Sequence, residues 1–285
     1  MSTAPDLGDW VGRQVTLTDD AGAGTFRRFA ALLDAPEGPR DPQWVPPLGH
    51  WLLFLPDAPQ STLGPDGHPR RGGFLPPIEL PNRLWAGSAV TLHRPIPVGS
   101  TLQKRTTIAA IDAKNGRSGP LVFVTLLHEV LVDGVLAIED RQEVAYRSTL
   151  PASEPASAAL SADPRTPDRV RTLVPDAVQL FRYSAITFNA HRIHYDLPYT
   201  REIEGHRDLV VQGPYIAALL LDHLLRSEPG LIVRTFRCRA RRPAYAGSAL
   251  HLNLRKTGAE QWELWATGEQ GGLHMEAEVQ AGPGP

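Results

Sequence analysis

A chain of 285 residues, 42% of them hydrophobic, is long enough for one large domain or two ordinary domains with packed cores. Its formal net charge is −2 and no apolar run could span a bilayer, so we expect neither nucleic acid nor a membrane as a partner. Cys238 is the single cysteine, which excludes an internal disulfide, and residues 1–10 do not resemble a signal peptide. We therefore expect a cytoplasmic protein.

The first half of the chain changes from helix and loop to strands. Residues 26–33 carry apolar side chains at helical spacing and predict a short amphipathic helix. The Pro-, Gly- and Trp-rich residues 41–87 predict a long ordered loop with a short apolar helix at 48–55. Extended apolar runs then predict strands at residues 90–92, 101–111, 121–132 and 135–146.

The second half follows a stretch of small residues and prolines at 150–169, whose composition is typical of a linker. We interpret the apolar residues 180–187 as a buried strand. Residues 215–226, which follow Pro214, are apolar nearly all round and predict a buried helix. Four more strands are predicted, at residues 231–240, 249–256, 262–267 and 273–279.

A nine-residue pattern, R-P-x-x-x-G-S-x-L, begins at Arg94 and again at Arg242. Each copy precedes a run of predicted strands, which favours a duplicated unit made of a helical segment and an antiparallel sheet. The sequence therefore predicts an α+β protein with units at residues 1–150 and 170–285, joined by a linker at 151–169. A sheet wrapped around the apolar helix would bury it.

The most polar stretch that follows an apolar run is residues 188–196, Phe-Asn-Ala-His-Arg-Ile-His-Tyr-Asp. Within it, residues 189–194 resemble the motif of MaoC-like hydratases and dehydratases: an acid, any residue, Asn, Pro, any residue, His. His194 falls on the catalytic histidine, Asn189 falls on the acid, and His191 and Arg192 replace the Asn-Pro pair.

Residues 64–77, 116–124 and 181–196 are similar to the double-hotdog dehydratases of this group. These include type 2 hydroxyacyl-thioester dehydratases and 3-methylfumaryl-CoA (mesaconyl-CoA) hydratases. The resemblance implies a double hotdog, with two antiparallel sheets each wrapped around a central apolar helix. It also implies an active site in the C-terminal unit and an N-terminal unit that has lost the motif and shapes the acyl pocket.

The implied activity is reversible hydration of an enoyl-CoA, most closely of the 3-methylfumaryl-CoA type, without a cofactor. His194 would take a proton from water and return it to the α-carbon. Asn189 would orient the water or His194, and Gly213, before the apolar helix, resembles the family's oxyanion-site glycine. His191, Tyr195 and Asp196 are candidates for supporting roles.

Coenzyme A carries phosphates, so basic residues should line its site. The candidates are Arg192 and the arginines of a predicted strand and the residues after it, Arg237, Arg239 and Arg242. A substrate with a free carboxylate, such as mesaconyl-CoA, would need one more cation near its acyl end. His191 and His194 have no third partner of metal-ligand context, so we expect no metal.

Two alternative functions stay open on the sequence. One is an acyl-CoA thioesterase, in which Asn189 holds the attacking water. The other is a non-catalytic acyl-thioester-binding protein, in which Asn189 marks lost activity. A homodimer formed through sheet edges is compatible with either alternative or with the hydratase.

Overall fold

A single ten-stranded antiparallel sheet forms the body of the computed structural model, which describes residues 7–35, 42–116, 119–148 and 162–284. The strands lie in the order β1-β3-β4-β5-β2-β7-β10-β9-β8-β6. Their bounds are β1 (Gln14–Asp20), β2 (Asn82–Leu92), β3 (Thr101–Gly116), β4 (Gly119–Val132), β5 (Val135–Arg147), β6 (Arg169–Leu173), β7 (Leu231–Ala240), β8 (Leu250–Lys256), β9 (Gln261–Gly268) and β10 (Leu273–Pro283).

The two halves of the sheet have the same topology. The first half runs β1-β3-β4-β5-β2, and the second, read from its own edge, runs β6-β8-β9-β10-β7. Arg94 follows β2 and Arg242 follows β7, so the repeated pattern lies at equivalent places and the predicted duplication is confirmed. The halves join where β2 pairs with β7, and there a Cβ on Gly87 would lie 2.3 Å from the carbonyl oxygen of Cys238.

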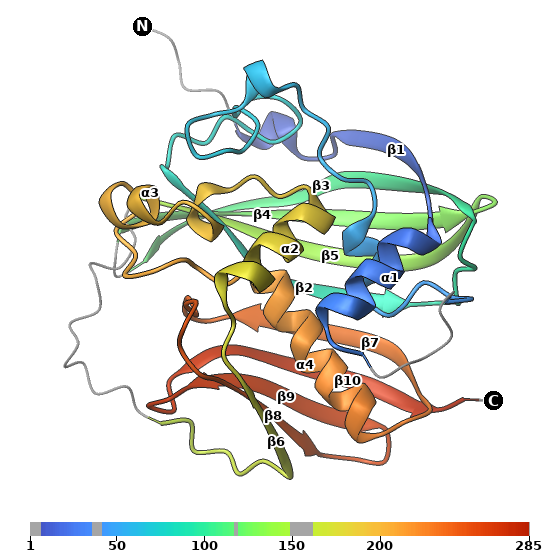
Figure 1. Ribbon diagram of the computed structural model, residues 1–285. Coiled ribbons are helices and arrows are strands. Elements are labelled where there is room, and N and C mark those ends of the chain that lie inside the picture. The colour runs from blue at the N-terminus through green and yellow to red at the C-terminus, as the bar shows by residue number, and fades with distance from the viewer. Residues whose placement is uncertain (1–6, 36–41, 117–118, 149–161, 285) are drawn as a thin grey trace, which may run out of the picture.

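Three helices lie across one face of the sheet: α1 (Ala23–Leu32), α2 (Ala177–Thr187) and α4 (Gly213–Ser227) (Figure 1). The predicted helices at 26–33 and 215–226 correspond to α1 and α4. Helix α4 buries Tyr215, Leu220 and Leu224 completely, in one core with the inward side chains of β7 to β10. The short elements are η1 (Leu7–Trp10), η2 (Gly49–Leu52), η3 (Gln60–Thr62), η4 (Arg192–His194) and α3 (Leu197–Glu202). None of the helices in the described ranges is long and apolar enough to cross a membrane.

The interpretation of residues 180–187 as a strand is wrong, because they form most of helix α2. A capping box begins the helix: the Asp176 carboxylate accepts from the Gln179 backbone, and the Gln179 side chain accepts from the Asp176 backbone. Leu180, Tyr183 and Ser184 then point into the core at helical spacing. A short apolar run has the same composition in a buried strand and a buried helix, and here the cap decides.

Three further boundaries differ from expectation. Strand β2 begins at Asn82, inside the predicted loop, and the helix expected at 48–55 is only the single turn η2. Of the predicted linker, residues 149–161 lie outside the described residues, and Arg169 already belongs to β6. Residues 1–6 and residues 117–118 of the family-like segment 116–124 also lie outside them.

Candidate active site

Residues 188–196 turn between α2 and α3, with η4 in their middle. Phe188 ends α2 in the left-handed region, at φ 48°, which redirects the chain. The Oδ1 atom of Asn189 accepts a hydrogen bond from the backbone N–H of His191 at 3.0 Å. The side-chain carbonyl of Asn189 therefore stabilises the turn. A water-holding role for this side chain stays a prediction.

His194 is held in one tautomer by a backbone carbonyl. Its Nδ1 lies 2.7 Å from the carbonyl oxygen of Val210 and donates to it, which leaves the Nε2 lone pair as an acceptor. The side chain is buried, and burial lowers the pKa of His194 to about 3. His194 is therefore a neutral imidazole at pH 7, with the correct atom available to accept a proton.

His191 packs edge-on against His194, with 5.5 Å between the ring centroids. Its Nε2 lies 3.9 Å from Oε1 of Glu204, and the interaction with His191 holds the pKa of that carboxyl below its usual range. Glu204 follows α3 and also accepts from the Tyr199 hydroxyl at 3.2 Å. The motif thus brings His191 and His194 together. Glu204, ten residues after His194, adds an acid beside them.

The N-terminal half contributes a further acid and histidine that the sequence did not reveal. The His68 ring lies 4.3 Å from the His191 ring, centroid to centroid, and its Nδ1 lies 3.1 Å from Oδ2 of Asp66. Although burial alone would raise it, the hydrogen bonds from His68 hold the pKa of Asp66 below its usual range. Burial lowers the pKa of His68 to about 4. The resulting Asp–His pair leaves the His68 Nε2 as an acceptor at neutral pH.

A tight backbone contact docks this loop on the motif. The backbone N–H of Arg192 donates to the carbonyl oxygen of Asp66 at 3.0 Å. Gly67 has φ +88°, and a Cβ there would lie 1.9 Å from the carbonyl oxygen of Ala190. The family-like segment 64–77 was a signal that this loop matters, but nothing in its sequence indicated what it touches.

Gly213 begins α4, three residues after the Val210 carbonyl that holds His194. The Trp85 ring packs directly on it, since a Cβ at Gly213 would lie 2.7 Å from a ring carbon. The preceding Gln212 is buried; its Nε2 donates to Leu180 and Ser184 at 3.0 Å, while its Oε1 has no hydrogen-bond partner in the described structure. The helix start is therefore near His194, as the oxyanion prediction for Gly213 requires.

The remaining motif side chains bond to the loop itself. Arg192 pairs with Asp196 at 2.7 Å, donates to the carbonyl oxygen of Pro65 at 3.0 Å and lies over the Tyr199 ring. Asp196 also caps α3, and its hydrogen bonds with Arg192 lower its pKa. The Tyr195 hydroxyl donates to the carbonyl oxygen of Ala190 at 3.0 Å. These residues stabilise the loop, and the phosphate-binding role of Arg192 stays a prediction.

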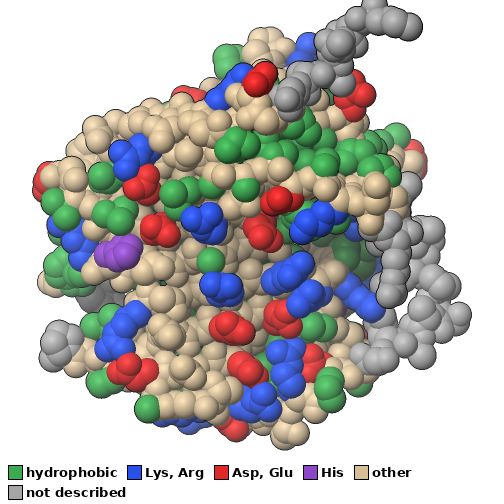
Figure 2. Space-filling model, turned by 180° about the vertical axis from the view of Figure 1, so that it is seen from behind, with side chains coloured by type: hydrophobic (Ala, Val, Ile, Leu, Met, Phe, Trp, Pro, Cys, Tyr) green, Lys and Arg blue, Asp and Glu red, His purple; other side chains and the backbone are tan. Residues whose placement is uncertain are grey.

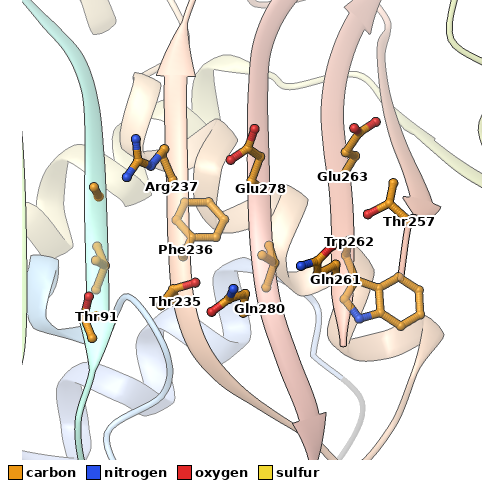
Figure 3. Close-up of a pocket in the computed structure, with 13 residues that line it drawn as sticks. Thr91, Thr235, Phe236, Arg237, Thr257, Gln261, Trp262, Glu263, Glu278 and Gln280 are labelled. Carbon is orange, nitrogen blue, oxygen red and sulfur yellow. The ribbon is translucent and has the colours of Figure 1, made fainter. Parts of the chain in front are cut away.

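Two of the other arginines predicted to bind coenzyme A, Arg237 and Arg239, point away from this site, and the role of Arg242 stays a prediction. Arg237 and Arg239 alternate on β7 with the core residues Phe236 and Cys238, so they point to the face of the sheet without helices. Figure 2 shows cationic and anionic side chains interspersed on that face. Arg237 and Glu278 line a hollow there, which also includes Thr235 and Gln280 (Figure 3). Arg242 lies just after β7, where its backbone N–H donates to the carbonyl oxygen of His274.

One group of side chains in the described ranges has the geometry to hold a metal ion. Asp66, His68 and His191 each offer one ligand atom, and these atoms lie within 4.8 Å of one another. Two of them, Asp66 and His68, already bond to each other. We therefore interpret the group as a proton-transfer cluster, and the expected absence of a metal stays a prediction.

Comparison with known proteins gives one consistent result. Residues 48–246 match the family model of type 2 hydroxyacyl-thioester dehydratases. A mesaconyl-C(4)-CoA hydratase of Chloroflexus aurantiacus is 41% identical over 283 residues, 99% of this chain and 100% of the relative. A mitochondrial type 2 hydroxyacyl-thioester dehydratase of Schizosaccharomyces pombe is 24% identical over 249 residues, 76% of this chain and 78% of the relative.

Solved structures show the same fold at low identity. A MaoC-like dehydratase of Phytophthora capsici superposes with a TM-score of 0.73 at 14% identity, covering 98% of both chains. A Mycobacterium tuberculosis protein described as a double hotdog superposes with a TM-score of 0.61 at 16% identity, covering 98% of both chains. The predicted double hotdog is thus confirmed, with the two sheets joined into one. The chain belongs to the type 2 hydroxyacyl-thioester dehydratase family.

Proposed function

We propose that this protein catalyses the reversible addition of water to an enoyl-CoA, and that its substrate is of the mesaconyl-C4-CoA type. The family match and the full-length relative, a mesaconyl-C(4)-CoA hydratase, support a hydratase or dehydratase. The observation that carries the proposal is the 2.7 Å contact between His194 Nδ1 and the Val210 carbonyl oxygen, because it leaves Nε2 available to act as the base.

The chemistry needs one base that also returns a proton. His194 Nε2 accepts a proton from water while the water oxygen bonds to the β-carbon, and the electron pair of the double bond moves toward the α-carbon and the thioester oxygen. The imidazolium then gives the same proton to the α-carbon. Because burial makes this imidazolium acidic, return of the proton is favoured, and the enzyme ends in its starting protonation state.

A second acceptor must orient the water, and Asn189 is engaged with the His191 backbone. We assign this role to His68, whose Nε2 is left as an acceptor by the bond from Nδ1 to Asp66. The backbone amides at the start of α4, around Gly213, would stabilise the negative charge that develops on the thioester oxygen. The active site would then combine groups from both halves of the chain.

The proposal is tested on a panel of enoyl-CoAs that includes mesaconyl-C4-CoA and crotonyl-CoA, with free thiol measured in parallel. We expect wild type to consume the conjugated enoyl thioester without thiol release, and His194→Gln to be inactive. His251→Gln, whose ring bonds to Thr172 at an edge of the sheet, should keep full activity. Thiol release would indicate the thioesterase instead, and binding without turnover would indicate an acyl-thioester-binding protein.

We further propose that the protein works in the cytoplasm as a homodimer, without nucleic acid, membrane or cofactor. Support for the dimer comes from the edge strands β1 and β6, which each pair on one side only in the described sheet. Light scattering coupled to size-exclusion chromatography would measure the mass, and a mass of about one chain would contradict the dimer. Cell fractionation would test the location.

A further inference from the structure

Arg83 lies on the helix-covered face of the sheet, next to the candidate active site. It pairs with Tyr146 across β2 and β5, and Trp85, two residues further along β2, points to the same side. Trp85 is the ring that packs on Gly213 at the start of α4. Arg83 is therefore one side-chain step along β2 from the predicted oxyanion site.

The guanidinium of Arg83 has no salt bridge to any carboxylate in the described part of the chain, although its side chain is only partly exposed. Arg71, from the same loop region, contrasts with it because Arg71 donates to the carbonyl oxygens of Ile78, Leu80 and Pro81. A guanidinium carries five donors in a planar fork that matches a carboxylate. Arg83 is thus a cation without a carboxylate partner among the described residues, near the start of β2.

Tyr146 supplies a second unmatched donor. Its side chain is completely buried, and the one group that interacts with its hydroxyl, Arg83, can only donate, so the hydroxyl hydrogen has no acceptor within the described ranges. Burial raises the pKa of Tyr146, so the hydroxyl stays protonated and able to donate. Native proteins rarely leave a buried hydroxyl unpaired, because the unpaired group loses its hydration without compensation. An acceptor brought by a ligand would satisfy it.

The electrostatic effect of Arg83 reaches the histidine cluster. Its charge lowers the pKa of His68 more than His191 does, although the His68 and His191 rings are 4.3 Å apart. The positive charge of Arg83 therefore acts on His68, the residue that we assign as the second water acceptor. A carboxylate bound by Arg83 would be held beside the attacking water.

We propose that Arg83 and Tyr146 bind the free carboxylate of a dicarboxylic enoyl-CoA substrate. This inference rests on the proposed hydratase function and adds the group that selects the acyl chain. In 3-methylfumaryl-CoA the carboxylate is attached to the β-carbon, the atom that water attacks. Binding it through two donors would fix that carbon against the water and offset the negative charge of the substrate.

The test compares two substrates on matched variants. Arg83→Gln and Tyr146→Phe each remove one proposed donor, and Arg141→Gln removes an exposed cation on the same strand as Tyr146. We expect Arg83→Gln to lower kcat/KM for mesaconyl-C4-CoA by about 10- to 100-fold, as for a lost hydrogen bond between charged groups, and Tyr146→Phe by about 3- to 10-fold, as for a typical single hydrogen bond. Activity on crotonyl-CoA, which has no free carboxylate, should change by less than about 2-fold, and Arg141→Gln should behave as wild type.

An equal loss on both substrates would overturn the proposal, because it would place the arginine at the phosphates of coenzyme A or in the fold. A measurement of binding affinity distinguishes failure of the carboxylate site from failure of the proposed hydratase function. In the His194→Gln background, isothermal titration with each thioester measures affinity without turnover. A weaker Kd for mesaconyl-C4-CoA alone, on adding Arg83→Gln, supports the carboxylate site even if wild type hydrates neither thioester. An unchanged Kd for mesaconyl-C4-CoA would contradict it.

Discussion

The Nδ1 atom of His194 lies 2.7 Å from the carbonyl oxygen of Val210, so a backbone group from the strand-like segment before α4 selects the tautomer of a buried imidazole. The same segment continues through Gln212 into the start of the helix. The proton acceptor and the predicted oxyanion donors are therefore fixed by one short piece of backbone. This coupling lets a single element position both charges that develop during hydration.

Burial of His194 predicts a pH-dependent stability. The folded pKa of about 3 lies below the ordinary histidine pKa of 6.5, so the unfolded chain binds more protons between these values. The stabilising contribution is complete above pH 6.5 and is lost as the pH falls toward 3. We expect the free energy of unfolding, measured in urea, to change between pH 7.5 and pH 5 by about 2 kcal/mol less in His194→Gln than in wild type. An identical pH dependence in both proteins would mean that His194 does not titrate in this way.

His68 should affect turnover more than binding. We expect His68→Ala to lower kcat by about 10- to 100-fold with KM nearly unchanged, because it removes a water acceptor. Asp66→Asn should have a smaller effect and should shift the acid limb of the pH–rate profile, since Asp66 only positions His68. Steady-state kinetics across pH would measure both. A change confined to KM would assign this pair to substrate binding.

Gly67→Ala tests the docking of the N-terminal loop. The new methyl group would meet the Ala190 carbonyl oxygen, and the residue would keep a positive φ, so we expect a loss of roughly 2–3 kcal/mol and a large fall in kcat. Gly134→Ala is the matched control: it has φ +74° in a hairpin turn, but no atom lies within 4 Å of its Cβ. It should lose about 1 kcal/mol and keep its activity. Equal effects would show that strain, not the contact, is responsible.

Chelation tests the interpretation of Asp66, His68 and His191 as a proton-transfer cluster. Dialysis against EDTA should leave kcat unchanged, because Asp66 and His68 already satisfy each other. Elemental analysis of the same sample would provide the control. Activity that disappears with the chelator and returns with a divalent cation would make the three side chains metal ligands.

Much of the architecture follows from local sequence patterns, and the errors have physical causes. The apolar residues of α4 and the repeated pattern at Arg94 and Arg242 predicted the buried helix and the duplication. Residues 180–187 were misassigned because composition alone does not separate a short buried helix from a strand, whereas the Asp176–Gln179 cap does.

The site was predictable only where it is local. Asn189, His191 and His194 are close in sequence and close in space, and the motif resemblance identified them. Asp66 and His68 reach the same place from more than 120 residues away, through contacts between loops that no periodicity indicates. Asp140 illustrates the same limit: it is a buried carboxylate that accepts hydrogen bonds from His50 and Trp51, and its strand pattern does not distinguish it from a surface acid.

Mass spectrometry of mesaconyl-C4-CoA incubated with the wild-type enzyme in H₂¹⁸O would show whether His194 directs water to the double bond. Hydration by a neutral His194 predicts a product that has gained one molecule of labelled water while the CoA thioester stays intact, and no such product with His194→Gln. Free CoA with ¹⁸O in the released acid, or the same labelled adduct from the variant, would contradict hydration by His194.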